Sequence, residues 1–174
     1  MTGSGSGSNI WIAAGEGDNE RVQTLLANGI NVNVADDHGY TALHAAASYD
    51  RLATIELLLQ HGANVNCTDT DGDTPLFACE TVQCAEALLA GGADAAVRNA
   101  EGKTAAEAAA EDVDKLAVSE YLRARYPATY DPANVTEPAE EDEEYQRRLE
   151  AMLQAADAAT STASVNTDES DVDA

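Results

Sequence analysis

Residues 39–47 read Gly-Tyr-Thr-Ala-Leu-His-Ala-Ala-Ala, and this stretch belongs to a pattern that the chain repeats. Nine residues between positions 10 and 33 recur 33 positions later, eight of them unchanged and Ile10 as Leu43, so that Leu25 recurs as Leu58 and Gly29 as Gly62. The Gly-x-Thr motif of residues 39–41 also returns at 72–74 and at 102–104. A period of about 33 residues is typical of a solenoid, in which each unit buries one face against the next.

Each unit contains signals for a turn followed by two helices. Gly39 suits a turn that needs positive φ, Asp36 and Asp69 are expected to brace such turns, and Thr41 is a suitable helix N-cap. A second helix is predicted over residues 52–60, because its apolar residues are spaced at helical intervals. These apolar residues are Leu52, Ile55, Leu58 and Leu59.

With these residues in this order, the chain resembles ankyrin-repeat proteins over residues 9–126. The resemblance implies an all-α solenoid of stacked helix-turn-helix pairs with turn or hairpin tips. The residues that match the family pattern best are 39–47, 61–66, 72–77 and 91–94. The four implied units cover residues 9–35, 36–68, 69–98 and 99–126. In residues 9–14 and 71–77, the chain also resembles small single-domain fungal ankyrin proteins of unassigned function.

Three units depart from the family pattern. The first begins directly at residues 9–11, as expected of an N-terminal cap. The third is three residues short, and we expect the deletion around residues 80–82, between its two helices. The fourth has Ala-Ala-Glu at residues 105–107 where Pro-Leu-His would stand, and a long second helix is predicted from about residue 115 to 125. Polar residues in place of apolar ones indicate a C-terminal cap.

The segments outside the repeats differ from them in composition. Residues 1–8 form a flexible Gly/Ser leader, and residues 127–142 form a proline-containing, acidic linker. An amphipathic helix is a candidate over residues 143–159. The last segment, residues 160–174, is polar and acidic without periodicity, which favours disorder.

The N-terminal segment and the cysteines indicate in which cellular compartment the protein is expected. The leader is neither basic nor apolar enough for a signal or transit peptide, and no stretch approaches 18 apolar residues. Cys67, Cys79 and Cys84 are odd in number and contain no Cys-x-x-Cys pair. We therefore expect reduced thiols and a cytoplasmic and/or nuclear protein.

The chain is strongly acidic, with a formal net charge of −23. Residues 127–174 hold 13 acidic and two basic side chains, net −11, and residues 1–126 hold 19 and seven, net −12. Nucleic acids and anionic membrane surfaces are disfavoured as partners, because binding to them depends on Lys and Arg. The acidity either keeps the protein soluble or attracts a basic protein partner.

No pattern of catalytic or metal-binding residues stands out. Asp69, Asp71 and Asp73 faintly suggest a calcium loop, but Gly72 stands fourth in that loop rather than sixth, and the repeat turn already explains it. No nucleophile motif, phosphate-binding glycine loop or zinc-type spacing occurs. We therefore expect no enzyme activity, no cofactor and no metal.

The resemblance also implies structural roles for two residues and a place for the binding surface. His44 occupies the slot in which the family's histidine bonds backbone near the turn, and Trp11, its equivalent in the first unit, is assigned to core packing. Ankyrin proteins bind through their turn tips and the exposed face of their first helices. The matching residues are Glu16, Asp37, His38, Tyr40, Ser48, Tyr49, Thr70, Asp71, Asp73, Thr81, Glu101 and Lys103.

Three functions remain open, all for an expected monomer without catalytic activity. The first is a protein–protein interaction module, an adaptor or scaffold that binds its partner through the concave face of the repeats. The second is an acidic escort chaperone for a basic client, such as a ribosomal protein or a histone. The third is a regulator that covers an enzyme.

Overall fold

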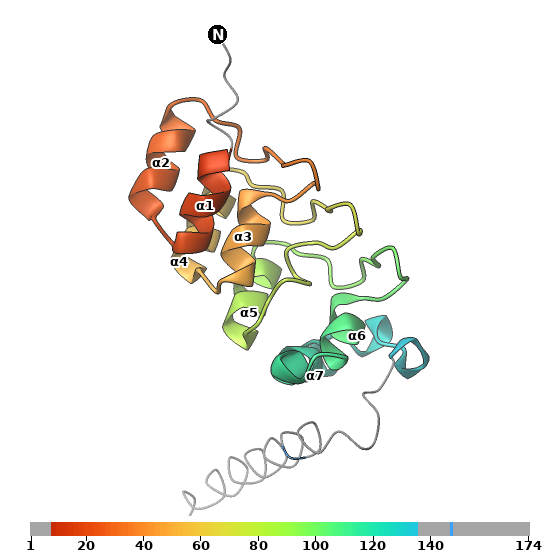
Figure 1. Ribbon diagram of the computed structural model, residues 1–174. Helices are drawn as coiled ribbons and strands as arrows, with labels where there is room; N and C mark the ends of the chain where they lie inside the picture. Colours follow the sequence, from red (N-terminus) through yellow and green to blue (C-terminus); the bar gives the residue numbers. More distant parts are fainter. Residues whose placement is uncertain (1–7, 136–146, 148–174) are drawn as a thin grey trace, which may run out of the picture. The chain divides into compact units, whose positions relative to one another are not determined.

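The computed structural model describes residues 8–135 and residue 147, and residues 8–135 fold into a stack of helices (Figure 1). This part contains seven α-helices and no strand. Apart from residue 147, four segments lie outside the described residues: the leader up to residue 7, the linker beyond residue 135, the predicted helix over 143–159 and the tail 160–174. The helices are α1 Ser8–Glu16, α2 Asn19–Ala27, α3 Ala42–Ser48, α4 Leu52–Gln60, α5 Val82–Ala90, α6 Ala105–Ala110 and α7 Leu116–Arg125.

The core lies between successive units, as the repeat pattern predicts. α1 packs on α3 (Figure 1) and α4 packs on α5, each pair from two successive units, while α6 packs on α7 within the fourth unit. Alanines at the contact, such as Ala14 and Ala46, are fully buried and let the helix axes approach closely. The second helices supply the larger side chains, of which Leu58, Leu88 and Leu122 are at most 1% exposed. The predicted solenoid is therefore confirmed, and the predicted helix over residues 52–60 coincides with α4.

Each turn is braced by the side chain at its first position. That side chain accepts hydrogen bonds of 2.9–3.1 Å from the backbone N–H groups two and four residues later. The bracing residues are Asp36, Asp69 and Asn99, so the expected role of both aspartates is confirmed. Gly39 has φ of +78°, and a Cβ there would lie 2.9 Å from the Asp69 backbone of the next turn. A glycine is therefore required by both conformation and space.

Backbone hydrogen bonds tie the turns to one another. The Thr70 N–H donates to the His38 carbonyl and the Ala100 N–H to the Asp71 carbonyl, both at 2.8 Å. The three loops that carry these turns project side by side from the helices (Figure 1). The tips therefore form one continuous edge rather than three independent loops.

A second kind of contact starts from the position that His44, the third residue of α3, holds in the second unit. Trp11 holds the same position in the first unit, 33 residues earlier. In the first unit the Trp11 indole Nε1–H donates to the Val34 carbonyl at 3.2 Å. In the second, His44 Nε2 lies 3.0 Å from the Asp73 carbonyl, while His44 Nδ1 lies 3.2 Å from the Thr41 backbone N. Burial lowers the pKa of the His44 imidazole. The ring is therefore held neutral, with its proton on Nε2 toward the next unit.

The third unit differs from the prediction in its first helix. Residues 75–78 form only a turn, in which the Phe77 N–H donates to Thr74 O at 2.9 Å and the Ala78 N–H to Pro75 O at 3.2 Å. Thr81 caps α5 by accepting a 3.1 Å bond from the Cys84 N–H. The three missing residues therefore shorten the first helix itself, where we expected only a tight connection between two helices.

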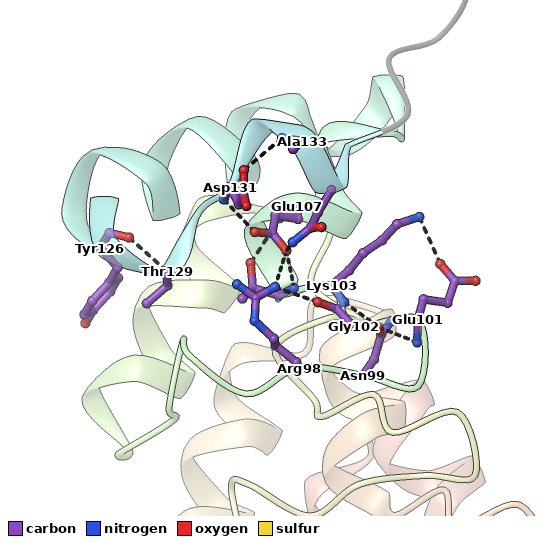
Figure 2. Close-up of polar contacts among 12 residues, drawn as sticks. Arg98, Asn99, Glu101, Gly102, Lys103, Glu107, Tyr126, Thr129, Asp131 and Ala133 are labelled. Carbon is purple, nitrogen blue, oxygen red and sulfur yellow. Dashed lines mark hydrogen bonds and ion pairs between the residues drawn. The ribbon is translucent and has the colours of Figure 1, made fainter.

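The fourth unit is covered by residues 127–135, which the sequence assigned to a linker. These residues form two 3-10 turns, Pro127–Thr129 and Pro132–Asn134, and return to the fully buried Glu107 (Figure 2). One Glu107 oxygen, Oε1, accepts a 2.6 Å bond from the Asp131 N–H. The other, Oε2, accepts bonds from the Thr104 N–H at 2.9 Å and from Arg98 Nη1 at 2.8 Å. Glu107 takes the place of His44, and residues 127–135 take the place of a further turn.

The Glu107 carboxylate should make stability depend on pH. Burial alone would raise its pKa, but the hydrogen bonds from the Thr104 and Asp131 N–H groups and the Arg98 guanidinium outweigh burial and lower the pKa. A lowered folded-state pKa means that this stabilisation is present above the unfolded value of about 4.3. It is lost as pH falls through the folded-state value.

We therefore predict that Glu107→Gln lowers the free energy of unfolding at pH 7 by about 1–3 kcal/mol, because one amide cannot satisfy all of these donors. Urea denaturation from pH 7 to pH 3 measures the effect, and the gap between variant and wild type should narrow in acid. A gap that stays constant over this range would contradict the assigned role of the ionised carboxylate.

The burial of α4 gives a second prediction. Leu58→Ala should reduce the free energy of unfolding by about 2–5 kcal/mol, because Leu58 is fully buried. Ile12→Ala is the matched control, since it also truncates an aliphatic side chain but Ile12 is 51% exposed. Chemical denaturation of both variants should show a loss for Ile12→Ala that is far smaller. Similar losses would refute the assigned core.

The packing of residues 127–135 gives a third prediction. A chain that ends at residue 137 should keep the wild-type melting temperature, because Glu107 retains its bond from Asp131. A chain that ends at residue 126 should melt several degrees lower, because it leaves the buried carboxylate short of a donor. Calorimetry of the two truncations checks this, and equal melting temperatures would show that the 3-10 turns contribute nothing to the stack.

Candidate protein-interaction surface

A groove of about 530 Å³ lies along the exposed face of α1 and α3, and we call it the N-terminal groove. In the described part of the chain, the large apolar side chains that are exposed are Ile12, at 51%, and Tyr49, at 62%. Both line this groove. The residues that line it are Trp11, Ile12, Gly15, Glu16, Tyr40, Ala45, Tyr49 and Arg51.

The contact between α1 and α3 positions these side chains. Arg51 Nε donates a 2.8 Å hydrogen bond to the Gly15 carbonyl, which fixes the end of α1 against the start of α4. A Cβ at Gly15 would lie 3.1 Å from the Tyr49 ring, so the ring lies close against the α1 backbone. The sequence folds this way because the small residue at position 15 leaves space for an aromatic ring from the next unit.

Tyr40 is held in place by two contacts. Its hydroxyl lies 2.8 Å from the Ser48 hydroxyl, and its ring stacks on the His44 ring with centroids 5.1 Å apart. Burial raises the pKa of the Tyr40 phenol. The wall of the groove is therefore already ordered before any ligand binds, which reduces the entropy cost of binding.

The predicted site residues fall into three groups. The first is at the groove and consists of Glu16, Tyr40, Tyr49 and Ser48, which bonds Tyr40. A second group is exposed at the tips of the three turns, and we call it the turn-tip edge. Its members are Asp37, His38, Thr70, Asp71 and Glu101.

The third group already has partners within the stack. The Asp73 carboxylate accepts a 2.9 Å bond from Asn99 Nδ2, and burial raises its pKa. Lys103 pairs with Glu101 at 2.9 Å and with Glu111 at 2.7 Å (Figure 2 shows the Glu101 pair). Thr81 Oγ1 donates to Asp50 Oδ1 at 2.6 Å besides capping α5. These three side chains are committed to neighbouring residues, and their contact with a partner stays a prediction.

Ile12 and Arg51 were not among the predicted site residues, whereas the predicted packing of Trp11 against the core is confirmed. Trp11 is half-buried and lines the groove as well as donating to Val34. One signal for Ile12 was present in the sequence, because Ile12 aligns with Ala45 at the 33-residue period. A bulky apolar residue at a position where the next unit has alanine indicates a contact outside the regular packing.

Among residues 8–135, no group of three or more His, Cys, Asp or Glu side chains is arranged to hold a metal ion. No helix in this part is long and apolar enough to cross a membrane.

Comparisons with known proteins agree with this architecture. A family model described as ankyrin repeats (3 copies) matches residues 7–69. An ankyrin repeat-containing protein of Schizosaccharomyces pombe is 39% identical over 115 residues, which make up 66% of this chain and 56% of that protein. The chain thus spans little more than half the length of this curated relative.

Proposed function

Since this chain is an ankyrin-repeat protein, we propose that it is a non-catalytic adaptor or scaffold that binds a protein partner through the N-terminal groove and the turn-tip edge. Ankyrin repeats indicate a protein–protein interaction module. The observation that carries the proposal is the position of Ile12 and Tyr49, the exposed large apolar side chains of the described part, in one groove.

The groove has the composition expected of an interface centre. Exposed apolar side chains that gather in one place mark binding sites more often than scattered ones do. Tyr and Trp are common hot-spot residues, because they bury a large area and lose little conformational entropy. Tyr40 and Trp11 are also held by hydrogen bonds to Ser48 and Val34. We therefore propose that an apolar side chain of the partner inserts between Ile12 and Tyr49.

The surroundings of the groove favour a basic partner. Glu16 lies at its rim, 3.8 Å from Arg21 and with 62% of its side chain exposed, and the turn-tip edge adds Asp37 and Asp71. Carboxylates at a rim attract Lys and Arg and suppress acidic partners. The partner that fits best therefore presents an apolar residue flanked by basic ones.

The proposal can be tested with paired variants in an affinity pull-down from lysate of the native source. The double variant Ile12→Ser with Tyr49→Ser should lose the specific partner, and each single change should weaken binding by about 2 kcal/mol if the residue is a hot spot. Calorimetric titration with the purified partner measures that loss. Because both side chains are exposed, the variants should remain folded.

The control for this test removes apolar groups from the opposite side of the stack. Leu59→Ser truncates a half-buried residue of α4, which does not line the groove. This control should retain the partner when its folding is confirmed by circular dichroism. Retention by the Ile12 and Tyr49 double variant would move the binding site away from the groove.

A second pair of variants tests the charge of the turn-tip edge. Asp37→Lys with Asp71→Lys should weaken the complex and flatten its dependence on salt, since exposed charges act within a Debye length of about 8–10 Å. Glu56→Lys with Glu86→Lys makes the same change of charge on the exposed sides of α4 and α5. Equal effects of the two pairs would show that only net charge matters.

The acidic escort remains the alternative function, because the chain carries a net charge of −23. It differs from the adaptor in its dependence on residues 138–174, which would form part of the client site. If removal of these residues abolishes capture of a basic client while the groove variants retain it, the escort replaces the adaptor.

A further inference from the structure

Cys79 and Cys84 form a pair of thiols inside the third unit. Their sulfur atoms lie 2.8 Å apart, and their side chains are 1% and 0% exposed. Both are free cysteines. A disulfide bond has an S–S distance of about 2.05 Å. Closing the pair therefore requires only a small movement of the two side chains.

The pair exists because the third unit is shortened. At the same positions, the second unit has Ala46 and Thr54, eight residues apart, and no cysteine. In the third unit the two positions are five residues apart, on either side of the short connection that ends at Thr81. The deletion has thus placed two thiols on either side of the shortened connection. The other units have no cysteine at the equivalent positions.

The local contacts direct both sulfur atoms to the same place. Cys79 Sγ lies 3.7 Å from the Pro75 carbonyl, at the start of the residual turn. Cys84 stands in the first turn of α5, with its N–H bonded to Thr81 Oγ1 at 3.1 Å and its sulfur 3.6 Å from the Ala47 carbonyl. The turn, the N-cap and α3 therefore position the pair without any contribution from the half-buried Cys67.

We propose that Cys79 and Cys84 are a modification site at which a peroxide closes an intramolecular disulfide within the folded third unit. One thiol, as its thiolate, attacks a peroxide oxygen, the O–O bond breaks, and a sulfenic acid and one water are formed. The second thiol then attacks the sulfenic sulfur, the S–O bond breaks, and a second water leaves. Two thiols are oxidised and one hydrogen peroxide is reduced to two waters.

The environment of the pair sets the conditions of the reaction. The contact with Cys84 and burial raise the pKa of the Cys79 thiol, so the thiolate that starts the reaction is scarce at neutral pH. The oxidation should therefore be slow and should accelerate as pH rises. Reduction by dithiothreitol should restore both thiols.

The experiment uses the full, reduced chain and one molar equivalent of hydrogen peroxide, because the proposed reaction consumes one peroxide per disulfide and excess would oxidise Cys67 as well. After oxidation, the chain is denatured in guanidinium, alkylated with N-ethylmaleimide and weighed. We expect loss of about 2 Da and one maleimide in place of three, because Cys67 alone stays reactive. Protease cleavage after Glu80 separates Cys79 from Cys84 in sequence. The peptide that begins at residue 81 should therefore stay attached until it is reduced.

Two variants and one control decide whether the fold directs this pairing. Cys67→Ser should still form the bond, and Cys79→Ser should not form an intramolecular disulfide. Oxidation of the wild-type chain in guanidinium should give a mixture of the three possible pairings, whereas the folded chain gives one. Three alkylated cysteines after oxidation, a bond to Cys67, or the same mixture from the folded chain would overturn the proposal.

Discussion

The stack depends on a polar contact that three of its four units make with a loop or turn further along the chain, from the position that His44 holds in the second unit. Trp11 reaches Val34 in the first unit, His44 reaches Asp73 in the second, and Glu107 reaches Asp131 in the fourth. Three different side chains thus make one connection. A single unit cannot bury enough apolar surface to fold alone, so these contacts help make neighbouring units one cooperative body. At the third unit Phe77 occupies this position and packs against the core as a half-buried apolar side chain.

Periodicity predicts the features that every unit shares. It predicts less well the features that occur in a single unit. The bounds of α4 and the bracing by Asp36 and Asp69 follow from spacing and turn chemistry, and the structure confirms them. The packing of residues 127–135 did not follow, because prolines and acidic residues resemble a linker unless the buried Glu107 is known to need a donor. Likewise, comparison of the units placed the three-residue deletion around residues 80–82. It did not predict the loss of the first helix, which follows because Thr81 must already cap α5 and leaves only residues 75–78 for a turn.

The candidate surface shows the same division. Tyr40 and Tyr49 were predicted because they occupy positions that the family uses for binding, and both line the groove. Ile12 was missed, because the exposure of one helix face is set by the neighbouring unit. Small residues at the contact between α1 and α3 bring the helices close together, and Ile12 and Tyr49 remain exposed along this face. The groove is thus a consequence of the close packing of α1 on α3.

A footprint of the complex tests the central claim most directly. Hydroxyl-radical labelling of the chain, alone and with its captured partner, reports the exposure of individual side chains. We predict that the partner protects Trp11, Ile12 and Tyr49 most strongly and leaves Leu57 and Leu59 of α4 unchanged. Protection confined to α2 and α4, with Ile12 and Tyr49 as reactive in the complex as in the free chain, would contradict the account.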